Sequence, residues 1–340
     1  MTENRWSVEK IRKWYDNQPW PCGFNYIPAN AIGYTEMWMD YCFDPVFIEK
    51  ELLLAKEIGF NCIRVVLPFI VWENEPEAFK QRFDAFLEIC DKCGLKVMPS
   101  LFDDCCFGDQ INPVFGKQPD VIPGWYGNGW TPSPGHGIVR DSSQWGRLEP
   151  YVKDIVGSFK NDSRVWIWDL YNEPTNGLTI GKISLPLGNV TLPLLEKVVK
   201  WAREINPSQP LTIGSWDNND ALNEIAWNCS DIITFHNYAN GERVKENINQ
   251  LKAFDRPIIC TEWLNRGLIS SVGEILSVFK DENVGAMHWG LVNGKTQTHL
   301  CWCHLPGQPD PPVWQHDLYY SDHTPYDINE INLFKSLGYL

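Results

Sequence analysis

The sequence predicts a single (β/α)8 barrel. Short apolar runs of strand type alternate eight times with longer amphipathic segments of helix type, which is the order of a barrel of parallel strands. The runs are almost continuously apolar, as expected for parallel strands that are covered on both sides. A doubly wound open sheet is the main alternative. That fold normally carries a Gly-rich phosphate-binding loop after its first strand, and no such loop follows here.

The elements follow one another in a regular order along the chain. The predicted strands are GFNYI (23–27), NCIRVVLP (61–68), KVMPSLF (96–102), VWIWDLY (165–171), LTIGSW (211–216), DIITFHN (231–237), PIICTEW (257–263) and VGAMHWG (284–290). The predicted helices span 44–59, 77–94, 149–161, 192–206, 220–228, 243–254, 272–283 and 326–337. Several of these helices stop at a glycine, which favours a left-handed C-cap.

The length of the chain fits one barrel. A chain of 340 residues is long for an ordinary domain, but barrels of this class commonly reach it undivided. No linker interrupts the pattern, so residues 1–340 are predicted to form one domain. Two loops exceed the usual length, 103–140 after the third strand and 291–325 after the eighth. Long loops with their own aromatic residues are usually functional, so we expect both to lie over the carboxyl ends of the strands.

Composition excludes several classes of partner. A net charge of −14 argues against binding to nucleic acid or to an anionic membrane, because both need a basic surface. No apolar run approaches the length of a transmembrane helix. The first residues, MTENRWSVEK, lack the apolar core of a signal peptide, and the eleven cysteines are scattered. These features predict free thiols and a cytoplasmic location; the alternative is a natural leader that Met1 has replaced.

Tryptophan is unusually abundant, with 17 residues in the chain. Several must belong to the core, but four lie in polar segments rich in Gly and Pro. Flat aromatic faces outside regular elements often serve as stacking platforms for ligands, sugars included. The four are Trp125, Trp130, Trp302 and Trp314.

Two glutamates stand at the ends of predicted strands. Glu173 ends the fourth strand in WDLYNEP, where Pro174 supplies no backbone donor and helps to stop the strand. Glu262 ends the seventh strand in CTEW. In a parallel barrel both side chains converge over the same mouth. Such a pair suits acetal hydrolysis, in which a protonated carboxyl group assists the leaving oxygen and an ionised one attacks the anomeric carbon.

Other polar and aromatic residues share these strand ends. Arg64 is placed to hold Glu262 ionised, and Asn172 is placed to position a sugar hydroxyl. Each has a structural alternative, such as a surface ion pair for the arginine. Independent structural roles would not all fall on one face of a barrel, so the joint placement favours a site. Three candidates remain. His236 and Tyr238 follow the sixth strand and can donate hydrogen bonds, and Trp289 ends the eighth strand, where its ring can pack against a pyranose ring.

The chain resembles the retaining glycoside hydrolases of clan A, and most of all family 5, the cellulase and mannanase group. The resemblance runs from PWPCGFNYIPANAI to HTPYDINEI and includes IRV, LYNEP, HNY, TEW and HWG at strand ends. It implies Glu173 as the acid/base and Glu262 as the nucleophile. It also implies a catalytic subsite lined by Asn172, Arg64, His236, Tyr238 and Trp289, with a carbohydrate as the substrate and no cofactor.

One segment departs from the family pattern. The third strand of many relatives ends near a histidine that faces the sugar, whereas SLFDDCC offers Asp103 and Asp104. These aspartates either accept hydrogen bonds from two sugar hydroxyls or cap the loop. The sequence leaves both readings open.

Three other functions compete with a glycosidase. The segment THLCWCH brings His299, Cys301, Cys303 and His304 together, but its spacing differs from that of structural zinc sites, so no metal is predicted. A non-catalytic carbohydrate-binding barrel would not need both strand-end glutamates. A cysteine-nucleophile hydrolase is disfavoured because no cysteine has a histidine partner by spacing.

The long loops also predict the scale of the substrate. Loops 103–140 and 291–325 are long enough to wall off one end of the barrel mouth. A walled mouth favours a pocket, and therefore exo-action or short oligosaccharides, over a cleft for endo-action on polysaccharide. The glycone stays open among glucose, mannose, galactose and xylose, and the oligomeric state stays open as well.

Overall fold

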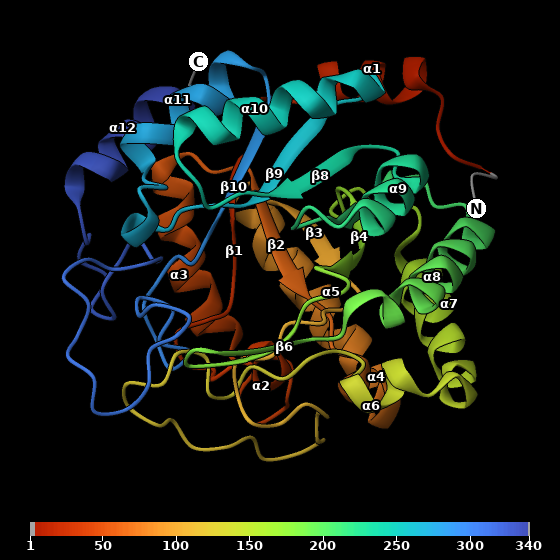
Figure 1. Ribbon diagram of the computed structural model, residues 1–340, viewed down its shortest axis with the longest axis horizontal. Helices are drawn as coiled ribbons and strands as arrows, with labels where there is room; N and C mark the ends of the chain where they lie inside the picture. Colours follow the sequence, from red (N-terminus) through yellow and green to blue (C-terminus); the bar gives the residue numbers. More distant parts are fainter. Residues whose placement is uncertain (1–3, 339–340) are drawn as a thin grey trace.

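The computed structural model describes residues 4–338, and its centre is a sheet of eight parallel strands (Figure 1). Neighbouring strands follow the order β7-β4-β3-β2-β1-β10-β9-β8, and a parallel bridge between Ser215 and Phe235 joins the two ends. The predicted (β/α)8 TIM barrel is therefore confirmed. The strands are β1 (Cys22–Asn25), β2 (Cys62–Val66), β3 (Lys96–Ser100), β4 (Trp168–Asn172), β7 (Leu211–Gly214), β8 (Ile233–His236), β9 (Ile258–Glu262) and β10 (Gly285–Trp289).

Each predicted strand overlaps one of these eight, and the differences lie at the ends. The largest is in β4, which begins at Trp168, three residues later than predicted. Val165 makes only an isolated bridge with Val97, so the first part of this apolar run is not a strand. Apolar character marks burial, but a single bridge, here with hydrogen bonds between Val97 and residues 164 and 166, does not make a strand.

Helices surround the barrel, and the eight predicted ones are all present. They are α3 (Pro45–Ile58), α5 (Pro76–Lys92), α7 (Leu148–Phe159), α8 (Leu192–Ile205), α9 (Asp220–Cys229), α10 (Gly241–Leu251), α11 (Val272–Asp281) and α12 (Ile328–Gly338). Four helices were not predicted: α1 (Val8–Asp16), α2 (Tyr34–Met37), α4 (Phe69–Asn74) and α6 (His136–Arg140). Among residues 4–338, no helix is long and apolar enough to cross a membrane.

Local signals explain how a typical barrel helix begins and ends. At the start of α3, the Asp44 carboxylate accepts hydrogen bonds from the backbone N–H groups of Val46 and Phe47, at 3.0 and 3.1 Å. At its end, Gly59 has φ 93°, and its N–H returns to the carbonyls of Ala55 and Lys56. A residue with a β-carbon is strained in that conformation, so glycine sets the length of the helix.

The unpredicted helix α1 closes the amino end of the barrel. Ile11 and Tyr15 of α1 pack in one apolar cluster with residues at the starts of strands, among them Cys62 and Ile259. In Figure 1 this helix lies at the top, away from the hairpin of β5 (Gly177–Ile180) and β6 (Ile183–Pro186) near the bottom. The cap leaves the opposite, carboxyl end of the strands as the open end.

The two long loops meet over that open end. Gly127 donates its backbone N–H to the Thr296 carbonyl at 2.9 Å, and Gly124 donates to the Gln297 amide oxygen at 2.8 Å. The Gln297 amide in turn donates to the Ile122 carbonyl at 2.9 Å. Segments about 170 residues apart in sequence thus form one wall.

Candidate active site

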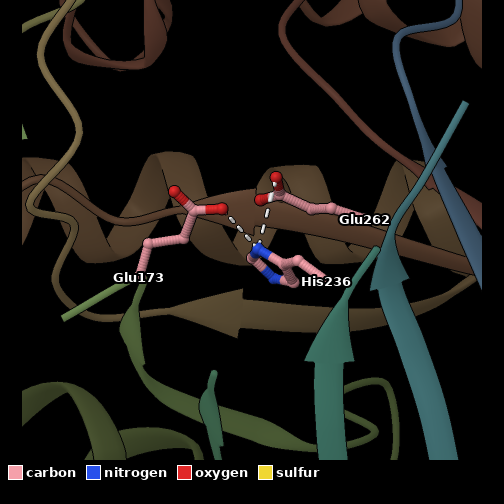
Figure 2. A group of neighbouring side chains, drawn as sticks. All are labelled: Glu173, His236 and Glu262. Atoms are coloured by element: carbon pink, nitrogen blue, oxygen red, sulfur yellow. Dashed lines mark hydrogen bonds and ion pairs between the residues drawn. The ribbon is translucent and has the colours of Figure 1, made fainter. Parts of the chain in front are cut away.

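Glu173 and Glu262 lie at the carboxyl ends of β4 and β9. Glu262 is the last residue of β9, and Glu173 directly follows β4 with φ 43°, in the left-handed region. This conformation is uncommon for a residue with a side chain and is typical of functional sites. The Glu173 N–H donates to the Gly214 carbonyl at 3.0 Å, which holds the turn in place. Figure 2 shows the two carboxylates with the His236 ring between them.

Arg64 of β2 is the cation of the site, and it is almost fully buried. Its Nη1 lies 2.8 Å from Glu262 Oε1 and 2.8 Å from Asn25 Oδ1. Its Nη2 lies 2.5 Å from Asp169 Oδ2 and 2.6 Å from Asn172 Oδ1. Burial disfavours the charged form, but the two carboxylates overcome this and raise the pKa of Arg64, so the guanidinium stays positive.

A glycine leaves room for this guanidinium. A β-carbon on Gly214 of β7 would lie 3.3 Å from Arg64 Nη2 and 3.3 Å from the Tyr171 carbonyl. Both distances are tighter than ordinary van der Waals contact. A side chain at position 214 would require Arg64 or the Tyr171 backbone to shift by a few tenths of an ångström, so the glycine suits the observed position of the guanidinium.

Glu173 has a different set of partners, none of which is a cation held against it. Its Oε2 accepts hydrogen bonds from the Cys105 thiol at 3.0 Å and from the Asn176 amide at 2.5 Å. Its Oε1 lies 2.6 Å from His236 Nδ1, which is also 3.4 Å from Glu262 Oε2. Burial raises the pKa of the Cys105 thiol well above its usual value, so this group stays protonated and donates.

Burial sets the direction of the pKa shifts. It raises the pKa of Glu173, although the donors Cys105 and Asn176 oppose the shift. It also raises the pKa of Glu262, where His236 and Arg64 oppose the shift and the Glu173 charge adds to it. Burial lowers the pKa of His236 to about 4, so the imidazole is neutral near pH 7. Nδ1 of this neutral ring faces both carboxylates, at 2.6 Å from Glu173 and 3.4 Å from Glu262.

Aromatic residues wall the cavity above the two glutamates. The cavity measures about 800 Å³, and Glu173, Glu262 and Asn172 lie on its wall. The Tyr238 hydroxyl donates to Glu262 Oε2 at 2.9 Å. Trp289, the last residue of β10, also lines the cavity. The residues that the sequence predicts around the glutamates do lie there: Arg64, Asn172, His236, Tyr238 and Trp289. Arg64 differs from the others, because it lies behind Glu262 and not on the cavity wall.

Two of the four predicted stacking platforms reach this cavity. Trp130 lines it with its ring 4.9 Å from that of Trp289, and Trp302 lines it with its ring 4.9 Å from that of Tyr238. Trp125 is not on the wall and donates its indole N–H to the Phe107 carbonyl at 3.0 Å. Trp314, the fourth, stacks instead on Tyr326, just before α12, with ring centroids 4.7 Å apart.

Asp103 and Asp104 lie behind the wall rather than on it. Both are fully buried and absent from the cavity lining. Asp103 accepts a hydrogen bond from the Asn172 amide at 2.7 Å, and Asp104 accepts one from the Tyr171 hydroxyl at 2.7 Å. Their carboxylates are occupied by protein donors, which favours the structural reading over contact with sugar hydroxyls. Burial is also the main reason that their pKa values rise, to about 6 for Asp103 and about 7 for Asp104.

The side chains of the Cys/His segment do not converge on a common point. Both ring nitrogens of His304 face backbone carbonyls, at 2.7 Å from Gly124 and 3.1 Å from Pro309. The His299 ring packs against Trp314, with centroids 5.2 Å apart. Cys301 and Cys303 face each other with Sγ atoms 3.4 Å apart. This arrangement supplies a dithiol rather than a four-ligand metal site.

Within residues 4–338, one group has ligand atoms close enough to hold a metal ion together. It consists of Glu173, His236 and Glu262, whose atoms lie within 4.8 Å of one another (Figure 2). The Arg64 guanidinium already lies 2.8 Å from Glu262 and supplies a positive charge there. A second cation beside it would be repelled, so the group fits a catalytic carboxylate pair better than a metal.

Sequence reasoning missed several residues of the site. The missed residues are Asn25, Cys105, Asp169, Asn176 and Trp216. Asp169 left a signal, because an acid inside the apolar run VWIWDLY needs a buried cation as partner. Cys105 and Asn176 left none, since their contacts with Glu173 depend on loops that fold back after β3 and β4.

Solved structures with the same fold include several glycosidases. The chain aligns with the exo-β-1,4-mannosidase Op5Man5 from Opitutaceae bacterium strain TAV5 at a TM-score of 0.60 and 16% identity, over 94% of this chain and 59% of that one. It aligns with the endo-β-1,4-mannanase from Thermotoga petrophila at a TM-score of 0.60 and 13% identity, over 95% of this chain and 77% of that one. It aligns with β-glucuronidase 2 from Bacteroides uniformis at a TM-score of 0.59 and 14% identity, over 94% of this chain and 35% of that one. The chain therefore spans about a third of that glucuronidase, and these likenesses show the fold.

The family follows from a direct comparison of the sequence with family models. A search of curated proteins returned no match. The model described as Cellulase (glycosyl hydrolase family 5) matches residues 25–298, from the end of β1 to the loop after β10. This range contains both glutamates, Arg64 and the donors around them. The chain belongs to glycosyl hydrolase family 5, the cellulase family.

Proposed function

We propose that this family 5 hydrolase is a β-glycosidase that cleaves β-linked glycosides or short oligosaccharides by double displacement. Glu262 is the nucleophile and Glu173 is the acid/base. The observation that carries this assignment is the unequal surroundings of the two carboxylates. Glu262 has the Arg64 cation at 2.8 Å, whereas Glu173 is held by a thiol, an amide and a neutral imidazole.

The charge balance supports the same assignment. Arg64 and Asp169 form one buried ion pair, and an ionised Glu262 adds one further negative charge. A second charge on Glu173 would stand a few ångströms from the first and is disfavoured in a buried site. One arrangement therefore predominates before reaction: Glu262 is ionised and Glu173 carries a proton.

The reaction then proceeds in two balanced steps. Glu262 attacks the anomeric carbon, and the bond to the leaving oxygen breaks as Glu173 gives that oxygen its proton. The resulting glycosyl ester removes the charge of Glu262, so the pKa of Glu173 falls. Glu173 next takes a proton from water, the water oxygen attacks the anomeric carbon, and the ester breaks. Two displacements at one carbon leave the configuration unchanged.

The distance between the glutamates fits this mechanism. One ligand atom of Glu173 lies within 4.8 Å of one of Glu262. Retaining enzymes keep their carboxyl groups about 5–5.5 Å apart, whereas inverting enzymes need about 6.5–9.5 Å to admit a water. The spacing therefore supports attack by a carboxylate rather than by water.

The hydrogen bonds to Glu173 make a testable prediction about pH. The Cys105 thiol stabilises the ionised form of Glu173 and so opposes the rise of its pKa. Cys105→Ala removes this donor, which raises the pKa of Glu173 and moves the alkaline limb of kcat/KM to higher pH. Cys105→Ser keeps a donor and should leave the limb near its wild-type position. The acid limb, which reports Glu262, should not move in either variant. An alkaline limb unchanged in Cys105→Ala would contradict the acid/base role of Glu173.

The walled cavity supports exo-action or a preference for short chains. Hydrogen bonds between loops 103–140 and 291–325 close one side of the barrel mouth, and Trp130 and Trp302 line it. The fold likenesses do not choose between the modes, because the exo-mannosidase and the endo-mannanase align equally well. A screen of nitrophenyl β-glycosides identifies the glycone.

The mode of action is tested by following products over time. On a soluble β-glycan or a β-linked oligosaccharide, monosaccharide or a single short product is expected from the first time points, with little fall in viscosity. A pocket admits only chain ends, so the average chain length falls slowly. Early random shortening with little small sugar would instead assign an open cleft and endo-action.

A further inference from the structure

The segment of residues 301–304 presents two thiols to solvent in one tight turn. The His304 N–H donates to the Cys301 carbonyl at 2.8 Å, which closes the turn and brings the Sγ atoms of Cys301 and Cys303 to 3.4 Å. Cys303 is exposed and Cys301 is partly exposed. The two thiols are already adjacent and accessible to small molecules.

Other cysteines lack this combination. Cys105 and Cys106 are neighbours in sequence, but both are buried and each thiol already faces an oxygen, in Glu173 and in the Gly108 carbonyl. Cys42 is partly exposed, and its thiol faces the Asn30 carbonyl at 3.8 Å. Access and proximity therefore coincide at Cys301 and Cys303.

The residue between the two thiols connects the turn to the cavity. Trp302 lines the cavity, and its ring meets that of Tyr238 edge-on with centroids 4.9 Å apart. The Tyr238 hydroxyl donates to Glu262 at 2.9 Å. The backbone N–H of Trp302 donates to the Gln315 amide oxygen at 3.2 Å. A change in the turn is therefore transmitted to the aromatic wall of the cavity.

We propose that Cys301 and Cys303 form a site of reversible disulfide formation that repositions Trp302 in the cavity wall. The oxidant is a low-molecular-weight disulfide such as glutathione disulfide. The Cys303 thiolate attacks one of its sulfurs and releases the first glutathione as a thiolate. The Cys301 thiolate then attacks the Cys303 sulfur of the mixed disulfide and releases the second. Two protein thiols are oxidised, one small disulfide is reduced to two thiols, and no other reactant is needed.

Closure changes the geometry of the turn. A disulfide has an S–S bond of about 2.05 Å, so the two sulfurs must approach each other from 3.4 Å. The turn tightens and carries Trp302 with it, whereas Arg64 and the strand ends continue to hold the glutamates. We therefore expect substrate binding to weaken, with KM raised severalfold and kcat changed little. The expected change in KM, which is the kinetic part of the proposal, rests on the proposed function. Formation of the disulfide, which is the chemical part, does not.

The chemical part is tested by mass. The full chain is equilibrated in glutathione buffers from fully reduced to strongly oxidised, trapped with iodoacetamide and mapped by peptide mass. The expected result is an internal disulfide between Cys301 and Cys303 that dithiothreitol reverses. Cys42→Ser, the matched control, should form it equally, and Cys303→Ser should not. Two alkylated thiols at the oxidised end, or a glutathione adduct on Cys303 that never closes, would overturn the proposal.

The kinetic part is tested on an aryl β-glycoside that the enzyme hydrolyses. The oxidised wild type should show a raised KM that returns to the reduced value with dithiothreitol, whereas Cys303→Ser, which lacks the attacking thiol, should give one KM in all buffers. A disulfide that forms without changing KM would overturn the link to Trp302. Because the mass result needs no catalysis, failure of the disulfide and failure of the glycosidase assignment are distinguishable.

Discussion

Glu262→Gln is expected to abolish turnover on every glycoside, including those with activated aryl leaving groups. An amide cannot form the glycosyl ester, so the first step has no nucleophile at any pH. Loss of the nucleophile in hydrolases costs on the order of 10⁴–10⁶-fold in kcat, and a loss of that size is expected here. The measurement is the steady-state rate on a panel of nitrophenyl and oligosaccharide substrates.

The fold of this variant should survive the change. The glutamine can still accept from Arg64 and contact Tyr238, and Arg64 keeps its pair with Asp169. Glu88→Gln, which removes an exposed glutamate paired with Lys92 on α5, is the matched control and should keep full activity. Turnover of Glu262→Gln within tenfold of wild type on any glycoside would remove Glu262 from the mechanism.

Glu173→Gln is expected to be selective for the leaving group. A substrate with a poor leaving group needs the proton of Glu173, so its rate should fall by roughly 10²–10⁴-fold. An activated aryl glycoside leaves without that proton, so the first step should be little affected and the glycosyl ester should accumulate. A burst of nitrophenol followed by a slow steady state is the expected signature.

Azide distinguishes the two roles. It needs no general base, so it should attack the ester in Glu173→Gln, restore turnover and give a glycosyl azide of retained β configuration. Product configuration by NMR is the readout. Rescue of Glu262→Gln with a retained product would mean that the roles are reversed. Unchanged activity of both variants on all glycosides would mean that the catalytic residues lie elsewhere.

The sequence alone determined the fold and the two glutamates, because both depend on local pattern. Apolar runs bounded by helical segments set the eight strands, and a parallel barrel brings the ends of its strands to one mouth whatever fills the loops. Glu173 and Glu262 could therefore be placed together from their positions at strand ends. Arg64, His236, Tyr238 and Trp289 followed by the same rule.

Only the tertiary structure decided which side chains touch those glutamates. Asp169 and Arg64, which are in contact, are separated by 105 positions in the sequence. Cys105 and Glu173, which are also in contact, are separated by 68 positions. Such contacts depend on rotamers and on how loops fold back, which no periodicity encodes. Asp104 shows the same limit. Its position after a strand suits a residue that binds a sugar hydroxyl, yet the side chain is buried and its carboxylate accepts a hydrogen bond from the Tyr171 hydroxyl. The physical reason is that strand-end position fixes where a side chain starts, while packing among distant segments fixes what it meets.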